Sequence, residues 1–331
     1  MKIAFYTGYA DCTVKENIYG SELSLMQLAK RLAKKHTVKL YTAKDKLNTA
    51  DHDVIIVSRY LIYFNYVEHK DAKLVIWSHD FNLLGWQYDK PLPEHGKYLL
   101  KNCMDKVDKV VCLSPWHQGI IKERHEIPEE LFTQIGHGIN NDDYEDGVER
   151  IPNTLMWTSD FVRSLPETIK MLNDIKGHKL TLNVYGKDSS PSRKVDAELK
   201  KLIDTSKHDI IMHGWTSNKE LIKGWQKTDI WFYPTNYYET YCITALEAQR
   251  AGCFCITSDI GALTTTVGDR GVRIAGDPNI EQFQTGIINS LQHYLDNRND
   301  MEKYRVRAQS WANEQTLDKT ANKWEEMLCD L

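Results

Sequence analysis

The sequence lacks the features that mark membrane-spanning or secreted proteins. No apolar run approaches the roughly 20 residues that a transmembrane helix needs, and the longest, around 54–57, has only the length of a strand. The N-terminus enters a strand pattern at Lys2 without the apolar segment and cleavage site of a signal peptide. We therefore expect a cytoplasmic protein.

Cysteine usage and glycine motifs give no sign of a disulfide scaffold, a zinc site or a dinucleotide site. The seven cysteines are an odd number without paired spacing, and there is no Cys-x-x-Cys or His/Cys cluster. Cys112, Cys253 and Cys255 lie in apolar strand-like runs, where buried thiols are common. The loop after Thr7 lacks the Gly-x-Gly-x-x-Gly of dinucleotide-binding dehydrogenases, which disfavours that class.

The charge balance lacks the basic excess of nucleic-acid-binding proteins. Lys and Arg number 42 against 46 Asp and Glu, which gives a net charge of −4. With 41% hydrophobic and 27% charged residues the composition is that of a globular protein, and 331 residues are about twice a typical domain. We expect a globular chain of two domains that does not bind nucleic acid.

Strand and helix patterns alternate along the chain, which predicts α/β layers around parallel sheets. Buried strands are indicated at 2–7, 38–42, 54–58, 74–78 and 110–114, and again at 154–158, 180–185, 210–213, 230–233 and 253–257. Helices are indicated at 22–35, 166–176, 197–205, 218–226 and 243–251, and throughout 281–331. The polar segment 140–153 predicts a linker. We place the domains at 1–148 and 149–310, and expect a helix at about 311–331 to pack back on the first domain.

The segment 234–252, Pro-Thr-Asn-Tyr-Tyr-Glu-Thr-Tyr-Cys-Ile-Thr-Ala-Leu-Glu-Ala-Gln-Arg-Ala-Gly, carries the strongest chemical signal. A predicted strand runs into a loop with Glu239, and a helix then opens near Cys242. A helix start has free amides that suit a pyrophosphate, and here they belong to Tyr241, Cys242 and Ile243. The Glu239 carboxylate is placed to hold sugar hydroxyls, and Glu247, about one turn into the helix, to accept hydrogen bonds from a ribose diol.

Glu239 and Glu247 are separated by seven residues, after a strand ending in Pro and before Ala-x-x-Ala-Gly. This pattern resembles the E-x7-E signature of the retaining glycosyltransferases of family four. Gly214-Trp-Thr, Glu220-Leu, Thr228-Asp-Ile-Trp and Ser258-Asp-Ile-Gly-Ala-Leu match the family in order and spacing, so the resemblance covers most of 154–275. It implies the GT-B fold, in which two Rossmann-like domains face a central cleft. The alternative is an amphipathic helix whose glutamates are merely solvated.

The resemblance also implies a UDP- or GDP-sugar donor, bound mainly by the C-terminal domain, with Thr240 among its contacts. In this family a loop after the first strand of that domain supplies a basic pair to the donor phosphates. Arg163 fits the second position, and the first is taken by Trp157 or lost. Lys187 either compensates or is simply solvated. Trp215 is expected to contact the base.

The chain departs from the family at Cys242, where the family usually has glycine or another small residue. We interpret this thiol as a packing group, and a nucleophilic role is the less favoured alternative.

In the N-terminal half, Gly20-Ser-Glu22 resembles the family's Gly-Gly-x-Glu entry, where backbone amides face the donor phosphates. Gly8 ends the first strand and is expected to line the same cleft. His79, in Trp77-Ser-His-Asp80, stands where the family often places a histidine that touches the donor sugar. The alternative for Gly20 is an ordinary turn glycine, and for Glu22 a glutamate that favours the first turn of a helix. The alternative for His79 is a structural His–Asp pair with Asp80.

Asp51-His-Asp53 matches the Asp-x-Asp metal motif of another glycosyltransferase fold, but it precedes its strand, which favours a polar turn. Since Arg163 and helix amides would offset the phosphate charge, we expect neither a metal nor another cofactor. Family members that act on lipid acceptors use a basic helix face to lie on anionic membranes. A similar face here, with simple solvation as its alternative, consists of Lys30, Arg31, Lys34 and Lys35.

Together these features predict a metal-independent, retaining glycosyltransferase of glycan or polysaccharide synthesis. Its acceptor, a hydroxyl of a glycan or lipid-linked molecule, is expected on the N-terminal domain, and its catalytic candidates are Glu239, His79 and Arg163. Two alternatives stay open: a nucleotide-sugar epimerase of the same fold, and a non-catalytic module that binds nucleotide sugars.

Overall fold

The chain forms two compact units. The computed structural model describes residues 1–8, 20–84, 94–186 and 193–331, the side chains of 193–196 excepted. The first unit comprises Met1–Gly138 and Leu317–Leu331, and the second comprises Ile139–Thr316. The unit boundaries lie at 138/139 and 316/317, where the sequence suggested 148/149 and about 310/311. Among the described residues, no helix combines the length and the apolar character needed to cross a membrane.

The first unit is built on a parallel sheet of six strands in the order β2-β1-β3-β4-β5-β6. Apolar and β-branched residues form these strands, whose central members are buried on both faces, as in other parallel sheets. The strands are β1 (Lys2–Tyr6), β2 (Thr37–Tyr41), β3 (Val54–Ser58), β4 (Lys73–Trp77), β5 (Lys109–Cys112) and β6 (Phe132–Gln134). The helices are α1 (Gly20–Leu32), α2 (Glu94–Cys103), α3 (Pro115–His125) and α11 (Leu317–Cys329).

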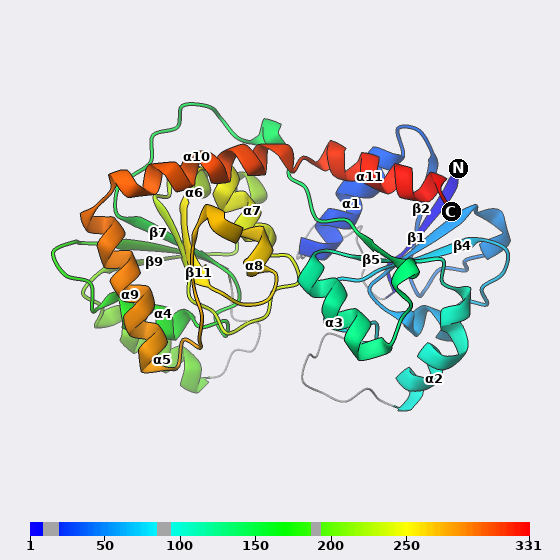
Figure 1. Cartoon of the computed structure of the whole chain (residues 1–331), viewed down its shortest axis with the longest axis horizontal. Coiled ribbons are helices and arrows are strands. Elements are labelled where there is room, and N and C mark those ends of the chain that lie inside the picture. The colour runs from blue at the N-terminus through cyan, green and yellow to red at the C-terminus, as the bar shows by residue number, and fades with distance from the viewer. Residues whose placement is uncertain (9–19, 85–93, 187–192) are drawn as a thin grey trace. The chain divides into compact units, whose positions relative to one another are not determined.

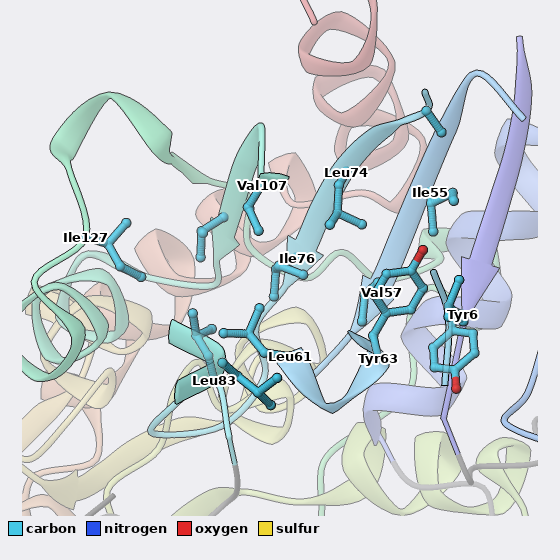
Figure 2. Close-up of a cluster of buried hydrophobic side chains, with 14 of the residues drawn as sticks. Tyr6, Ile55, Val57, Leu61, Tyr63, Leu74, Ile76, Leu83, Val107 and Ile127 are labelled. Carbon is cyan, nitrogen blue, oxygen red and sulfur yellow. The ribbon is translucent and has the colours of Figure 1, made fainter. Parts of the chain in front are cut away.

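Alternate residues of neighbouring strands build the core on one face of this sheet, since strand side chains alternate between faces. Figure 2 shows Ile55 and Val57 of β3 beside Leu74 and Ile76 of β4, all almost completely buried. Tyr6 of β1 meets Tyr63 of a short 3₁₀ helix (Leu61–Asn65) edge to face, with ring centroids 5.1 Å apart. This face of the sheet is therefore covered by apolar groups.

Helix α11 returns to the first unit and packs on α1 (Figure 1). Its buried Trp324 packs against Trp77, with ring centroids 4.9 Å apart. Its acidic side chains pair with the basic face of α1, Asp318 with Arg31 at 2.9 Å and Glu325 with Lys35 at 2.7 Å. Half of the four-residue basic face is thus already offset by carboxylates.

The second unit has a parallel sheet of six strands in the order β12-β11-β10-β7-β8-β9. The strands are β7 (Thr154–Thr158), β8 (Thr181–Tyr185), β9 (Asp209–Gly214), β10 (Ile230–Tyr233), β11 (Phe254–Ser258) and β12 (Val272–Ile274). The helices are α4 (Leu165–Leu172), α5 (Arg193–Asp204), α6 (Asn218–Lys227), α7 (Ile243–Arg250), α8 (Leu263–Thr266), α9 (Glu281–Asp296) and α10 (Asn299–Glu314). The two parallel-sheet α/β units confirm the predicted fold class.

The strand order reverses between β10 and β7 in the second unit, and between β1 and β3 in the first. Loops that follow the two strands at such a switch point diverge to opposite sides and leave room at the carboxyl edge, where ligands of open α/β sheets bind. The segment 159–164 after β7 and the segment 234–242 after β10 therefore lie where a ligand site is expected.

The region 281–331, predicted as helical throughout, is divided into α9, α10 and α11. The first break is anchored by Arg298, whose guanidinium donates to the buried Asp229 at 2.6 Å and to the Asn153 side chain at 3.1 Å. Arg305 of α10 also binds Asp229. These bonds hold α10 at the amino edge of the sheet, at residues just before β7 and β10. No sequence pattern predicts them.

Candidate active site

Arg163 and Glu239 meet at the switch point of the second unit. Arg163 lies in the loop after β7 and Glu239 in the loop after β10, and the Arg163 Nη1 donates to Glu239 Oε1 at 2.9 Å. The hydroxyl of Tyr233, the last residue of β10, donates to the same oxygen at 2.9 Å. Two residues selected separately from the sequence are thus in direct contact.

The Arg163 guanidinium is held on a second side by an aromatic ring. Its Cζ lies 3.7 Å from the centroid of Tyr237, a cation–π arrangement. Burial works against the charge, but Glu239, Tyr233 and Tyr237 together outweigh it and raise the pKa of Arg163. With 29% of its side chain exposed, this permanent cation remains accessible to an anionic ligand.

The backbone around Glu239 is fixed by the loop after β11. Ala262 N donates to the Glu239 carbonyl at 2.8 Å, and Thr235 N donates to Ser258 Oγ at 2.8 Å. Gly261 has a φ of +56°, and a Cβ there would lie 2.9 Å from both the Glu239 N and O. Only glycine fits so closely, so the loop that carries Glu239 is preorganised.

Helix α7 begins directly after this loop, at Ile243. Cys242 caps it with a left-handed φ of 71°, and Thr240 and Tyr241 precede it. The first amides of the helix have no partner within it and carry partial positive charge, which suits a phosphate. The Cys242 Sγ lies 3.1 Å from Thr244 Oγ1, and burial raises the pKa of the thiol, so it stays protonated. These surroundings favour packing over nucleophilic attack.

Glu247 lies one turn into α7 in an apolar environment. Burial raises its pKa to about 7, and a hydrogen bond from Trp225 Nε1 to its Oε2, 3.2 Å long, works in the opposite direction. A carboxyl group that titrates near neutrality can accept hydrogen bonds from a diol when ionised. The pair Glu239 and Glu247 is therefore differentiated by environment, an ion-paired loop carboxylate and a desolvated helix carboxylate.

The raised pKa of Glu247 gives a stability prediction. Because its pKa is higher in the folded chain than the ordinary 4.5, ionisation favours unfolding increasingly as the pH rises from there to about 7. Glu247→Gln keeps an acceptor for Trp225 without the charge. We expect equal melting temperatures for the variant and the wild type at about pH 4, and a higher one for the variant at about pH 8. Equal melting temperatures at both pH values would contradict the raised pKa.

Trp157 stands at the first of the two basic positions that the resemblance implies after β7. Trp157 is completely buried, and its ring packs on Tyr233 with centroids 5.0 Å apart. It is a core residue of β7 and no ligand of phosphate. Lys187, the residue suggested as its replacement, lies outside the described residues. Trp215 directly follows the edge strand β9 and is 54% exposed, as a platform for a base would be.

At the switch point of the first unit, Gly8 follows β1 with a left-handed φ of 61°, and Gly20 begins α1. Arg59, which follows β3, connects this region. Its Nη2 donates to Glu22 Oε1 at 3.2 Å and its Nη1 to Asp80 Oδ2 at 2.8 Å. Arg59 itself has a φ of 85°, a strained conformation that a non-glycine residue adopts only where its surroundings enforce it.

His79 follows β4 among aromatic rings. It stacks on His137 with centroids 5.9 Å apart and packs on Trp77 at 4.6 Å. Burial, reinforced by Arg59 and His137, lowers its pKa well below the ordinary value, so the imidazole is neutral. Asp80, the partner in the alternative His–Asp pair, binds Arg59 and the Tyr60 hydroxyl.

Asp51 and Asp53 lie just before β3, at the amino edge of the first sheet. Asp53 Oδ2 accepts a hydrogen bond from Lys2 N at 2.7 Å, which fixes the start of β1. No group of three or more metal-ligating side chains occurs among the described residues. Asp51 is the last residue of a short 3₁₀ helix (Thr49–Asp51).

Residues 162–308 match the family model described as glycosyl transferases group 1. This segment is similar to glycosyl transferases group 1 domains. It contains Arg163, Glu239 and Glu247, so the contacts described above lie within the matched residues. A comparison with curated protein sequences gives no significant match.

Several solved structures share the fold of the whole chain. HepE from Anabaena superposes with a TM-score of 0.78 at 15% identity and full coverage of both chains. Sucrose-phosphate synthase from Thermosynechococcus elongatus gives 0.79 at 13% identity, covering 100% of this chain and 99% of its own. A glycosyltransferase from Rickettsia africae gives 0.75 at 16% identity, covering 99% and 98%. The chain thus has the GT-B fold, and the matched segment lies in its second unit.

Proposed function

We propose that the chain is a retaining, metal-independent glycosyltransferase that moves a sugar from a UDP- or GDP-sugar to a hydroxyl acceptor. The observation that carries the proposal is the Arg163–Glu239 pair at the switch point, directly before the amide end of α7. In this proposal the cation and the helix amides bind a diphosphate, and the neighbouring carboxylate binds a sugar. HepE, which shares the fold, has been crystallised with UDP and with UDP-glucose.

The proposed chemistry follows from charge. As the nucleoside diphosphate departs, negative charge grows on its phosphates, and Arg163 with the α7 amides stabilises it. Glu239 holds hydroxyls of the transferred sugar, and Glu247 the ribose. The departing phosphate deprotonates the acceptor on the same face, which gives retention.

A panel of nucleotide sugars tests this function and its two rivals. The expected result is a rise in melting temperature with one class of donor, since a ligand that binds only the folded state stabilises it. Incubation with that donor should release free nucleoside diphosphate, slowly with water and faster with an acceptor. Conversion to an epimer without release would favour the epimerase, and binding without turnover would favour the non-catalytic module.

Metal independence is tested by chelation. Because Arg163 and the helix amides supply the positive charge, we expect donor turnover to continue in excess EDTA at an unchanged rate. Loss of turnover that manganese restores would contradict this expectation and direct attention to Asp51 and Asp53.

The acceptor is proposed to be a glycan or lipid-linked molecule of glycan synthesis in the cytoplasm, bound by the first unit. Since Arg31 and Lys35 are paired with α11, Lys30 and Lys34 would carry any peripheral contact with an anionic membrane.

A further inference from the structure

The hydroxyl of Tyr233 is a polar group placed deep in the second unit. The residue is 1% exposed, and its ring packs on Trp231 at 5.2 Å and on Trp157 at 5.0 Å. Phenylalanine would fill the same space without a hydroxyl to desolvate, and a buried hydroxyl is tolerated only where it finds partners. Here the partners are Glu239 Oε1 at 2.9 Å and Ser159 Oγ at 3.3 Å.

Glu239 Oε1 is the meeting point of two donors of different kinds. Arg163 Nη1 is charged and lies at the surface of the site, whereas the Tyr233 hydroxyl is neutral and buried. Arg163 is also the group that a diphosphate would attract. When it turns to a phosphate oxygen, the carboxylate, with 13% of its side chain exposed, loses its ionic partner in a poorly solvated place.

We propose that Tyr233 is a positioning residue that keeps Glu239 in place while Arg163 exchanges this carboxylate for the diphosphate of the donor. The inference rests on the proposed function and adds a residue to it. The centroid of the Tyr237 ring lies 3.7 Å from the Arg163 guanidinium carbon, and this contact limits how far the guanidinium moves during the exchange. Glu239 Oε2 is then presented to the sugar while Oε1 stays on the Tyr233 hydroxyl.

The test compares Tyr233→Phe with Tyr294→Phe. The control removes the hydroxyl of Tyr294, a residue of α9 in the same unit. This hydroxyl donates to the Tyr304 hydroxyl at 3.3 Å. Donor turnover gives kcat and KM, and calorimetry gives the affinity for the free nucleoside diphosphate. In Tyr233→Phe we expect kcat to fall about tenfold, the worth of a hydrogen bond to a charged group, with diphosphate affinity nearly unchanged. The control should retain wild-type kinetics.

A double variant shows whether Tyr233 acts through Glu239. In a Glu239→Ala background, Tyr233→Phe should cause no further fall in kcat, because the group that it positions is absent. A further tenfold fall would overturn the proposal. Wild-type kinetics in Tyr233→Phe alone, with an active wild type, would overturn the positioning role and leave the proposed function standing. A wild type that turns over no nucleotide sugar would overturn both.

Discussion

Glu239→Ala will lower kcat for donor turnover about 100-fold, while affinity for the free nucleoside diphosphate stays the same or rises slightly. The carboxylate is proposed to contact the reacting sugar, so its hydrogen bonds are strengthened as the sugar leaves. A contact that is stronger in the transition state than in the bound ground state affects kcat. In the ligand-free chain Glu239 also occupies Arg163. Its removal leaves that cation wholly available to phosphate, and diphosphate binding therefore does not suffer.

Glu247→Ala is the matched comparison, because it removes the other glutamate of the same segment. The ribose that Glu247 is proposed to hold does not react, so we expect a higher donor KM and weaker diphosphate binding, by about 1–3 kcal/mol, with a similar kcat. Purely structural glutamates would give small losses of stability and unchanged kinetics in both variants. That pair of results would remove the E-x7-E interpretation and most of the functional proposal.

The sheets were largely predictable from the sequence because their strands are continuous apolar runs between polar segments. The strands at 154–158 and 230–233 have the predicted bounds. Short elements such as β6 and β12, three residues each, offer too little periodicity to detect. The long helical region looked continuous because its first break depends on a tertiary contact, that of Arg298 with Asp229.

The sequence indicated candidate site residues, but it did not indicate the contacts between them. Arg163 and Glu239 are 76 positions apart in the chain, and they meet because β7 and β10 pair in the sheet. Strand order is a tertiary property that no local pattern encodes. The same holds for Trp157, whose identity does not reveal that it is buried beneath the site.

The sequence did not indicate three further residues for a related reason: Arg59, Tyr233 and Tyr237. Each acts through partners, and none belongs to a spacing motif. Of the three, Tyr233 had the clearest sequence indication of a role at the site, because its hydroxyl ends an otherwise apolar strand, Ile-Trp-Phe-Tyr. A polar tip at the carboxyl end of a buried strand, at the edge where ligands bind, is a reason to examine a residue.

Arg163→Ala should weaken binding of the free nucleoside diphosphate about 10- to 100-fold and leave binding of the nucleoside nearly unchanged. A charge-assisted hydrogen bond to phosphate contributes about 1.5–3 kcal/mol to binding. The nucleoside has no phosphate and therefore does not make this hydrogen bond. Trp157 stands at the other position proposed for a basic residue, and it is an uncharged side chain buried in the core. The segment 159–164 therefore offers no second cation that could replace Arg163. Calorimetry with both ligands measures the difference directly.

Arg298→Ala provides the control for Arg163→Ala. Arg298 is also a half-buried arginine of the second unit paired with a carboxylate, but it binds Asp229 at the amino edge of the sheet, away from the switch-point loops. Its loss should lower the melting temperature, because Asp229 is buried, and leave both ligand affinities unchanged. Arg163→Ala also deprives Glu239 of its ionic partner, yet Tyr233 still donates to that carboxylate, so the site stays assembled. If Arg163→Ala weakened the binding of nucleoside and nucleoside diphosphate equally, the guanidinium would not contact the phosphates. The amide end of α7 would then also lose its proposed role.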